Sequence, residues 1–307
     1  MKELKPFYYA LFDDADGFIV TLNLQFHFTR DTILPPYTAR LVKYAVYTSD
    51  CLEPIRLLYE SRGAHRPVTI TPLYTLSGRP LYQKADNDKP LVASRGVTLN
   101  ARIAAVAGNP VEIVESYTCG GRLPQPYDSV EFEVIEASVE KAESLSTGLT
   151  RPEIIKVEFK TPLVMSTKTM VPPSLQRKKI IERTPNVYRL LPTPGYLAAT
   201  LARTWIGALL GRDPDTHPEP YALGRIADIL VAEQAYNLKP TTILYGKTSE
   251  GEEKKIRGVT GWITYKIHSK RLALTLDKLL ALAERIGTGK NRSIGLGQIQ
   301  VKPQTIK

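Results

Sequence analysis

Cationic side chains and a histidine gather between positions 40 and 66 of this 307-residue chain. Four residues recur at the i, i+3, i+4 and i+7 spacing of one helix face: Arg40, Lys43, Tyr44 and Tyr47. The loop after the next predicted helix adds three more: Arg62, His65 and Arg66. If this loop folds back onto the helix, a histidine able to transfer protons near neutral pH lies among several cations.

This combination fits cleavage of RNA without a metal ion. A base removes the proton of the ribose 2′-hydroxyl, an acid protonates the leaving 5′-oxygen, and cations stabilise the charge that builds on the phosphate. We therefore predict four catalytic residues: Arg40, Lys43, His65 and Arg66. His27, on the polar side of a predicted strand, is a second candidate base and ranks below His65.

A second group of residues forms a glycine-rich loop near the C-terminal end, Gly287-Thr-Gly-Lys290-Asn-Arg292-Ser-Ile-Gly295-Leu-Gly297. Glycines permit positive φ and let backbone N–H groups approach a ligand, while the cations favour a phosphate. A nucleoside-triphosphate loop is disfavoured because such a loop runs from a strand into a helix and needs Ser or Thr after its lysine. Here the loop follows a predicted helix, and Asn291 occupies that position.

Composition favours an anionic partner. The formal net charge is +10 and the hydrophobic content is 43%, so a packed core with a basic surface is expected. No apolar run approaches the length of a membrane span and no signal peptide is visible, which predicts a cytoplasmic location. The two cysteines and four histidines show no metal-ligand or disulfide pattern, so we expect neither metal nor cofactor.

Hydrophobic periodicity predicts the same order of elements in both halves of the chain. The first half gives strand 18–28, helices 38–48 and 52–60, strands 67–76 and 97–106, a helix near 110–117 and strand 129–137. The second half gives strand 154–159, helices 195–210 and 220–235, strands 241–247 and 259–267, helix 270–286 and strand 298–301. Both approximate βαββαβ, so the predicted fold is α+β with tandem ferredoxin-like (RRM-like) domains, residues 1–145 and 152–307. Because no run of aromatic residues suits an RNA-binding sheet, we expect RNA in the cleft between the domains.

The glycine-rich loop, ending in Ser-Ile-Gly-Leu-Gly-Gln298, resembles the signature of the RAMP superfamily of CRISPR-associated proteins. With four further blocks the chain resembles the crenarchaeal branch of the sixth Cas family, the endoribonucleases that cut precursor CRISPR RNA within its repeats. These blocks are Asp31-Thr-Ile-Leu-Pro-Pro36, Lys160-Thr-Pro-Leu163, Val171-Pro-Pro-Ser-Leu175 and Arg257-Gly-Val-Thr-Gly-Trp262. The resemblance covers nearly the whole chain.

The resemblance implies metal-independent cleavage that leaves a 2′,3′-cyclic phosphate (or 3′-phosphate) and a 5′-OH. In this branch, lysines one turn apart on the first helix correspond to Arg40 and Lys43, another lysine corresponds to Arg66, and an arginine corresponds to Arg257. Arginine stays protonated and is a poor base, so we expect His65 to restore acid–base function.

The expected partner is CRISPR repeat RNA within its precursor, with an effector complex and a homodimer left open. We predict contacts to the RNA from seven residues outside the catalytic set: Lys168, Lys179, Arg257, Lys290, Asn291, Arg292 and Ser293. The loop glycines are Gly287, Gly289, Gly295 and Gly297. The competing interpretation is a non-catalytic RAMP subunit that holds guide RNA in an effector complex.

Overall fold

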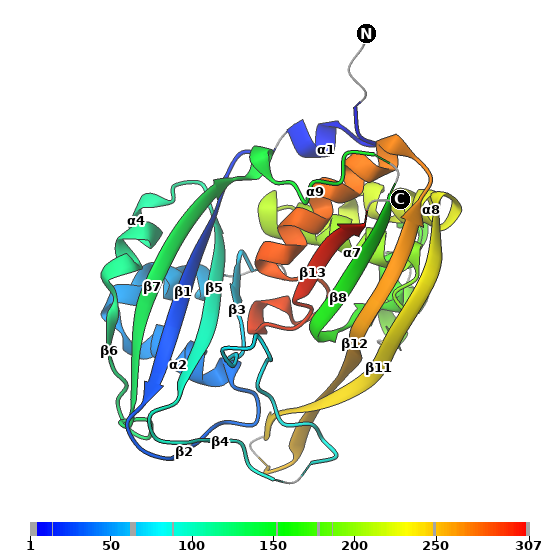
Figure 1. The fold of residues 1–307 in the computed structure, drawn as a ribbon. Coiled ribbons are helices and arrows are strands. Elements are labelled where there is room, and N and C mark those ends of the chain that lie inside the picture. The colour runs from blue at the N-terminus through cyan, green and yellow to red at the C-terminus, as the bar shows by residue number, and fades with distance from the viewer. Residues whose placement is uncertain are drawn as a thin grey trace.

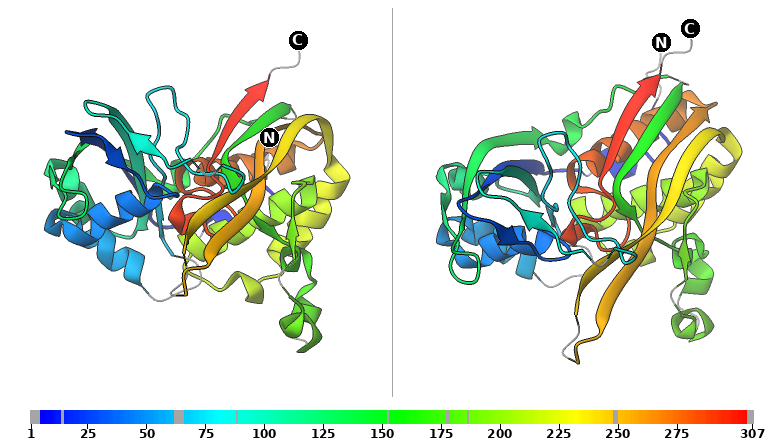
Figure 2. Two further views of the ribbon diagram at one scale, coloured as in Figure 1. Left: turned by 90° about the horizontal axis from the view of Figure 1, so that it is seen from below. Right: turned by 60° about the horizontal axis from the view of Figure 1, so that its bottom comes forward.

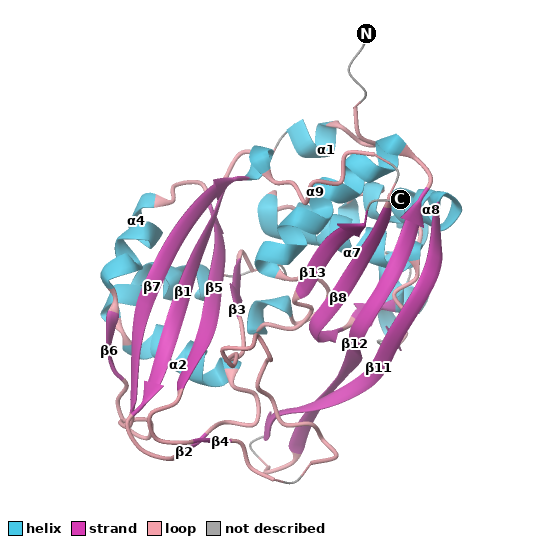
Figure 3. Cartoon of the chain, in the orientation of Figure 1, coloured by secondary structure: helices cyan, strands magenta, loops and turns pink. Residues whose placement is uncertain are grey.

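The fold consists of two antiparallel sheets that lie side by side, each backed by helices (Figures 1 and 3). The computed structural model describes residues 5–13, 15–61, 66–87, 89–151, 153–176, 179–185, 187–247 and 250–304. No helix within these ranges combines the length and the apolar character that crossing a bilayer would require.

The first sheet has the strand order β3-β5-β1-β7-β6, and its first four strands reproduce the ferredoxin-like arrangement. Its strands are β1 (Phe18–Phe28), β3 (Val68–Ile70), β5 (Thr98–Ala107), β6 (Gly120–Arg122) and β7 (Val130–Lys141). Its helices are α2 (Ala39–Thr48), α3 (Glu53–Glu60) and α4 (Val111–Val114). Two short strands, β2 (Thr32–Ile33) and β4 (Val92–Ala93), pair outside this sheet.

The alternation in β1 decides which side of the sheet carries α2. Side chains from Val20 to Phe28 that face the helices are at most 1% exposed and share one core cluster with Leu41 and Val42 of α2. Burying each such side chain is worth about 1.5–3 kcal/mol, so the inner face of α2 is fixed against the sheet and its cationic face turns outward.

The second sheet repeats the arrangement with the order β11-β12-β8-β13. Its strands are β8 (Ile154–Leu163), β11 (Val231–Lys247), β12 (Glu253–Ile267) and β13 (Ile299–Gln304). Its helices are α7 (Pro194–Thr204), α8 (Glu219–Leu230) and α9 (Lys270–Ile286). Smaller elements are α1 (Ala10–Asp13), β9 (Met165–Ser166), α5 (Pro173–Gln176), α6 (Lys179–Arg183) and β10 (Tyr188–Arg189). The predicted α+β fold with tandem ferredoxin-like units is thus confirmed.

Some predicted bounds are wrong. The strand predicted over 67–76 is only Val68–Ile70, and the strand predicted from 259 begins at Glu253. The helix predicted over 220–235 ends at Leu230, and β11 begins at Val231 rather than at position 241. The segment Ala232–Gln234 favours a helix by composition, but Val231 pairs with Ile267 at the far end of β12. A long partner strand therefore overrides local propensity.

The cysteines also depart from expectation. Cys51 and Cys119 form a disulfide with their Cα atoms 5.5 Å apart, within the usual range. The two positions are 68 residues apart in sequence, and the packing of α3 beside α4 brings the segments that carry them together.

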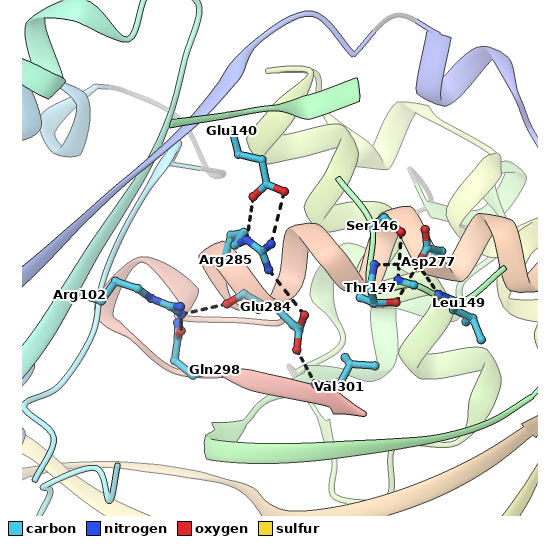
Figure 4. A network of polar contacts seen from close by, with 11 residues as sticks. Arg102, Glu140, Ser146, Thr147, Leu149, Asp277, Glu284, Arg285, Gln298 and Val301 are labelled. Carbon is cyan, nitrogen blue, oxygen red and sulfur yellow. Dashed lines mark hydrogen bonds and ion pairs between the residues drawn. The ribbon is translucent and has the colours of Figure 1, made fainter. Parts of the chain in front are cut away.

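Polar contacts join the two halves where α9 meets the first sheet (Figure 4). Arg102 of β5 donates to the Glu284 carbonyl at 2.9 Å and to Gln298 Oε1 at 2.7 Å, and Arg285 of α9 pairs with Glu140 of β7 at 2.9 Å. Deeper in α9, Asp277 accepts hydrogen bonds from the backbone N–H groups at positions 147 and 149. These contacts fix α9 against both the first sheet and the segment that connects the halves.

A second junction lies at the far end of β11. The loop after β3 pairs with this strand, because Ala85 N–H donates to Thr242 at 2.9 Å and Leu244 N–H donates to Gln83 at 3.0 Å. Figure 2 shows the loop crossing from the first sheet to the β11–β12 hairpin. The hairpin is thereby held close to α2.

Candidate active site and nucleic-acid interface

The outer face of α2 carries cations and tyrosines in the predicted arrangement. Arg40 is exposed, while Lys43, Tyr44 and Tyr47 are half-buried. Tyr44 donates to the Gln125 carbonyl at 2.6 Å, which fixes this ring. The helix therefore presents its two cations beside rings of restricted movement.

Tyr59 of α3 brings Lys43 and Arg66 together. Lys43 Nζ lies 4.8 Å from the centroid of the Tyr59 ring, and Arg66 Cζ lies 4.7 Å from the same centroid. Lys43 Nζ is also 5.0 Å from the Tyr47 ring. Cation–π contacts of this kind are worth about 0.5–2 kcal/mol and place two like charges where repulsion alone would separate them.

Electrostatics make Lys43 unusual among the cations. Partial burial lowers the pKa of Lys43, and the charges of Arg66 and Arg40 lower it further, with Glu60 acting in the opposite direction. An ammonium group with a lowered pKa is a stronger acid than an ordinary lysine, so it gives up a proton more readily near neutral pH.

Arg40 reaches the second half of the molecule. A Cβ built on Gly246 of β11 would lie 2.5 Å from Arg40 Nη1, so this strand passes directly over the guanidinium. The neighbouring Tyr245 packs against Tyr37, with ring centroids 5.8 Å apart. The cationic cluster, defined here as Arg40, Lys43 and Arg66, therefore lies where the β11–β12 hairpin meets α2.

Of the two histidines proposed as the base, the structure describes only His27. His65 lies outside the described residues, as does Arg62, so its catalytic role stays a prediction. His27 is exposed, and its Nδ1 lies 3.4 Å from Thr98 Oγ1. Because its neighbours Phe26 and Phe28 point into the core beneath α2, His27 points away from that helix. The sheet separates His27 from the cationic cluster and argues against it as the base.

The glycine-rich loop has the positive backbone angles expected of its glycines. Gly287, Gly289, Gly295 and Gly297 all have positive φ, between 64° and 86°. Several of its backbone N–H groups are bonded within the protein. Lys290 N–H donates to Val164 at 2.9 Å, and Gly297 N–H donates to Pro162 at 3.1 Å. Part of the loop backbone is therefore bonded to the neighbouring segment Pro162–Val164.

Arg292 was predicted to contact RNA, but the structure buries its side chain. Its side chain is 7% exposed and donates to Thr69 Oγ1 at 2.9 Å and to the Arg66 carbonyl. Burial lowers the pKa of Arg292 to about 10. Its guanidinium is thus directed to β3 and the residue two positions before it, and this burial argues against a contact with RNA.

The other predicted RNA contacts are accessible. Lys179, Arg257, Lys290 and Asn291 are exposed, and Lys168 and Ser293 are half-buried. Lys290 Nζ donates to the Tyr188 hydroxyl at 2.9 Å, which adds an exposed aromatic ring that the sequence patterns did not single out. Tyr59 was also missed, because a tyrosine on a second helix gives no signal until the two helices pack. Within the described ranges, no three His, Cys, Asp or Glu side chains gather as a metal site would require.

Two family models match the chain: the Cas6 N-terminal domain over residues 20–140 and the CRISPR-associated endoribonuclease Cas6 over residues 157–299. The chain belongs to the Cas6 family of CRISPR-associated endoribonucleases. Two relatives from Saccharolobus solfataricus, CRISPR-associated endoribonucleases Cas6 1 and Cas6 2, are 29% and 27% identical to it. These matches cover 89% and 91% of this chain and 92% and 94% of the relatives.

Solved Cas6 structures share the fold. Thermus thermophilus Cas6 matches with a TM-score of 0.60 at 18% identity, covering 93% of this chain and 99% of that one. A Cas6 product complex matches with a TM-score of 0.57 at 20% identity, covering 93% of this chain and all of that one. The family assignment agrees with the resemblance seen in the sequence.

Proposed function

We propose that this protein cuts precursor CRISPR RNA within its repeats by attack of a ribose 2′-hydroxyl, without a metal ion. The observation that carries the proposal is the packing of Lys43 and Arg66 on one Tyr59 ring, in a member of a family of endoribonucleases. The names of its relatives and the solved Cas6 product complex add support.

The proposed reaction needs no molecule besides the RNA. The 2′-oxygen bonds to the adjacent phosphorus, the bond from phosphorus to the 5′-oxygen breaks, and one proton moves from the 2′-hydroxyl to the 5′-oxygen through the protein. The products are a 2′,3′-cyclic phosphate and a 5′-OH end. DNA lacks the 2′-hydroxyl and cannot react in this way.

Each member of the cationic cluster has a role in this scheme. Arg40 and Arg66 stay protonated and stabilise the negative charge that builds on the phosphate oxygens. Lys43, whose pKa is lowered, serves as the acid that protonates the 5′-oxygen. His65 serves as the base, a role that rests on its place in the sequence one residue before Arg66.

Binding is proposed to involve both halves of the chain, with residues 1–145 carrying the catalytic cluster and residues 152–307 supplying further contacts. The contacts proposed are Lys168, Lys179, Arg257, Lys290, Asn291 and Ser293. A homodimer and an effector complex stay predictions as further partners.

Incubation of purified protein with repeat RNA in EDTA tests the proposal. Cleavage at one position, with product ends that polynucleotide kinase labels without prior phosphatase, is expected. A single 2′-deoxy substitution at the cut site should abolish cleavage and leave binding intact. Tight binding with uncut RNA would instead support the non-catalytic RAMP subunit.

A further inference from the structure

The buried guanidinium of Arg292, in the second half of the chain, donates two hydrogen bonds to residues of the first half. One goes to the Thr69 hydroxyl and the other to the Arg66 carbonyl, and no carboxylate pairs with it in the described residues. Enclosing an arginine in this way carries a desolvation cost, since a charge leaves water without an opposite charge beside it. Its two hydrogen bonds, to Thr69 and to Arg66, therefore indicate what the buried charge stabilises.

Another residue of the glycine-rich loop, Gly295, packs closely against β3, the strand that contains Thr69. A Cβ built on Gly295 would lie 2.5 Å from the Ile70 carbonyl, so only glycine allows this approach to β3. Thr69 in turn donates to the Ile286 carbonyl at 2.6 Å, at the end of α9. The loop and the end of α9 thus hold residues 66–70 from one side.

Two different parts of the chain contact Arg66, one at its carbonyl and one at its guanidinium. Its carbonyl is bonded by Arg292, while its guanidinium lies on the Tyr59 ring beside Lys43. Arg66 lies two residues before β3, and the bond from Arg292 to its carbonyl is one of the contacts that connect the catalytic cluster to the second half of the molecule.

We propose that Arg292 is a positioning residue for RNA cleavage: it holds the main chain of Arg66 so that the guanidinium stays on Tyr59 beside Lys43. The glycine-rich loop thereby couples the docking of the two sheets to the assembly of the active site. This inference rests on the proposed function and reassigns Arg292 from RNA contact to internal support.

Because Arg292 touches only the backbone of Arg66, the inference has a sharp consequence. Arg66→Ala keeps the carbonyl that Arg292 bonds but removes the guanidinium being positioned. Loss of Arg292 should then matter in the wild-type background and not in the Arg66→Ala background.

The test compares single-turnover cleavage of repeat RNA in EDTA at saturating enzyme for four proteins: wild type, R292A, R66A and the double variant. R292A is expected to slow cleavage roughly 10–100-fold, the size of effect produced by small misplacement of a catalytic group. Its affinity for repeat RNA should stay within about twofold of wild type. The double variant should be no slower than the slower single variant.

Independent effects, in which the two single-variant losses multiply, would overturn the inference, as would an R292A rate equal to wild type. R285A is the matched control, because it breaks another arginine contact between the halves, at Glu140, and should cleave at the wild-type rate. If R292A does not fold, R292K in both backgrounds gives the same comparison. Failure of wild type itself to cleave would count against the proposed function instead.

Discussion

At the scale of single residues, this protein gathers charges that would normally repel. Tyr59 offers one ring to both Lys43 and Arg66, and Arg40 lies one helical turn from Lys43. Burial lowers the pKa of Lys43, and the charges of Arg66 and Arg40 lower it further. Sites that perturb a pKa with specific neighbours are where acid–base chemistry is commonly found.

Replacing Lys43 tests whether this lysine transfers a proton or only supplies charge. K43A should slow single-turnover cleavage by roughly 10²-fold or more, the usual contribution of a general acid. K43R should stay nearly as slow, because arginine keeps the charge but does not release its proton. A K43R rate close to wild type would show that charge alone is needed.

The pH profile of cleavage gives an independent reading of the same residue. An acid must be protonated to act, so the wild-type rate should fall as pH rises through the pKa of Lys43. Since burial and neighbouring cations lower that pKa, the midpoint should lie below 10.5, the ordinary lysine value. The measurement is the single-turnover rate across pH, with K43A expected to lose this falling limb.

His65 is predicted to be the base, so H65A should slow cleavage roughly 10²-fold while repeat-RNA affinity stays near wild type. The matched comparison is H27A, because His27 projects from the face of the sheet that is turned away from α2. H27A should cleave at the wild-type rate. An unchanged H65A rate would remove histidine from the mechanism.

At the scale of elements, the glycine-rich loop determines how closely α9 and β13 approach the first sheet. Gly295 has a φ of 86° and also faces the Ile70 carbonyl, so its side-chain position is blocked twice. Gly251, at the tip of the β11–β12 hairpin, has the same φ of 86° with open space around it. Alanine substitutions at Gly251 and Gly295 therefore distinguish the cost of backbone strain, common to both, from the cost of close packing, which applies only at Gly295.

G251A should lower the free energy of unfolding by about 1 kcal/mol, the cost of a left-handed backbone for a residue with a Cβ. G295A should cost roughly 2–4 kcal/mol, because the added methyl group must also displace β3. Denaturant unfolding of both variants measures the difference. Equal losses of unfolding free energy in the two variants would mean that the loop accommodates the added methyl group and is not closely packed against β3.

The elements differ in how well sequence patterns predict them. Strand β1 and helix α9 were predicted to their exact residues, because each has a complete periodic pattern and a clear end, such as Gly287 after α9. The start of β11 was missed by ten residues, since its first half gains order from pairing with β12. Local patterns cannot reveal a strand that depends on a distant partner.

At the scale of the whole molecule, a net charge of +10 predicts RNA binding that weakens steeply with salt. Lys290 and Arg292 lie in one loop, yet the first is exposed and the second is buried. K290A should reduce the slope of log affinity against log salt by roughly 0.7–0.9, one phosphate contact. R292A should leave the slope unchanged, and an equal reduction in both would place Arg292 on the RNA.

The sequence by itself determined the tandem ferredoxin-like fold, the family and the helix face with Arg40 and Lys43, because these depend on periodic spacing and on motifs written in contiguous residues. Only the tertiary structure decided that Tyr59 joins Lys43 to Arg66, that His27 faces away and that Cys51 bonds Cys119. The tertiary structure also showed that Arg292 is buried, whereas the sequence had predicted it at the RNA-binding surface. Contacts between residues far apart in the chain arise from packing two sheets and their helices together, and local spacing carries no record of that packing.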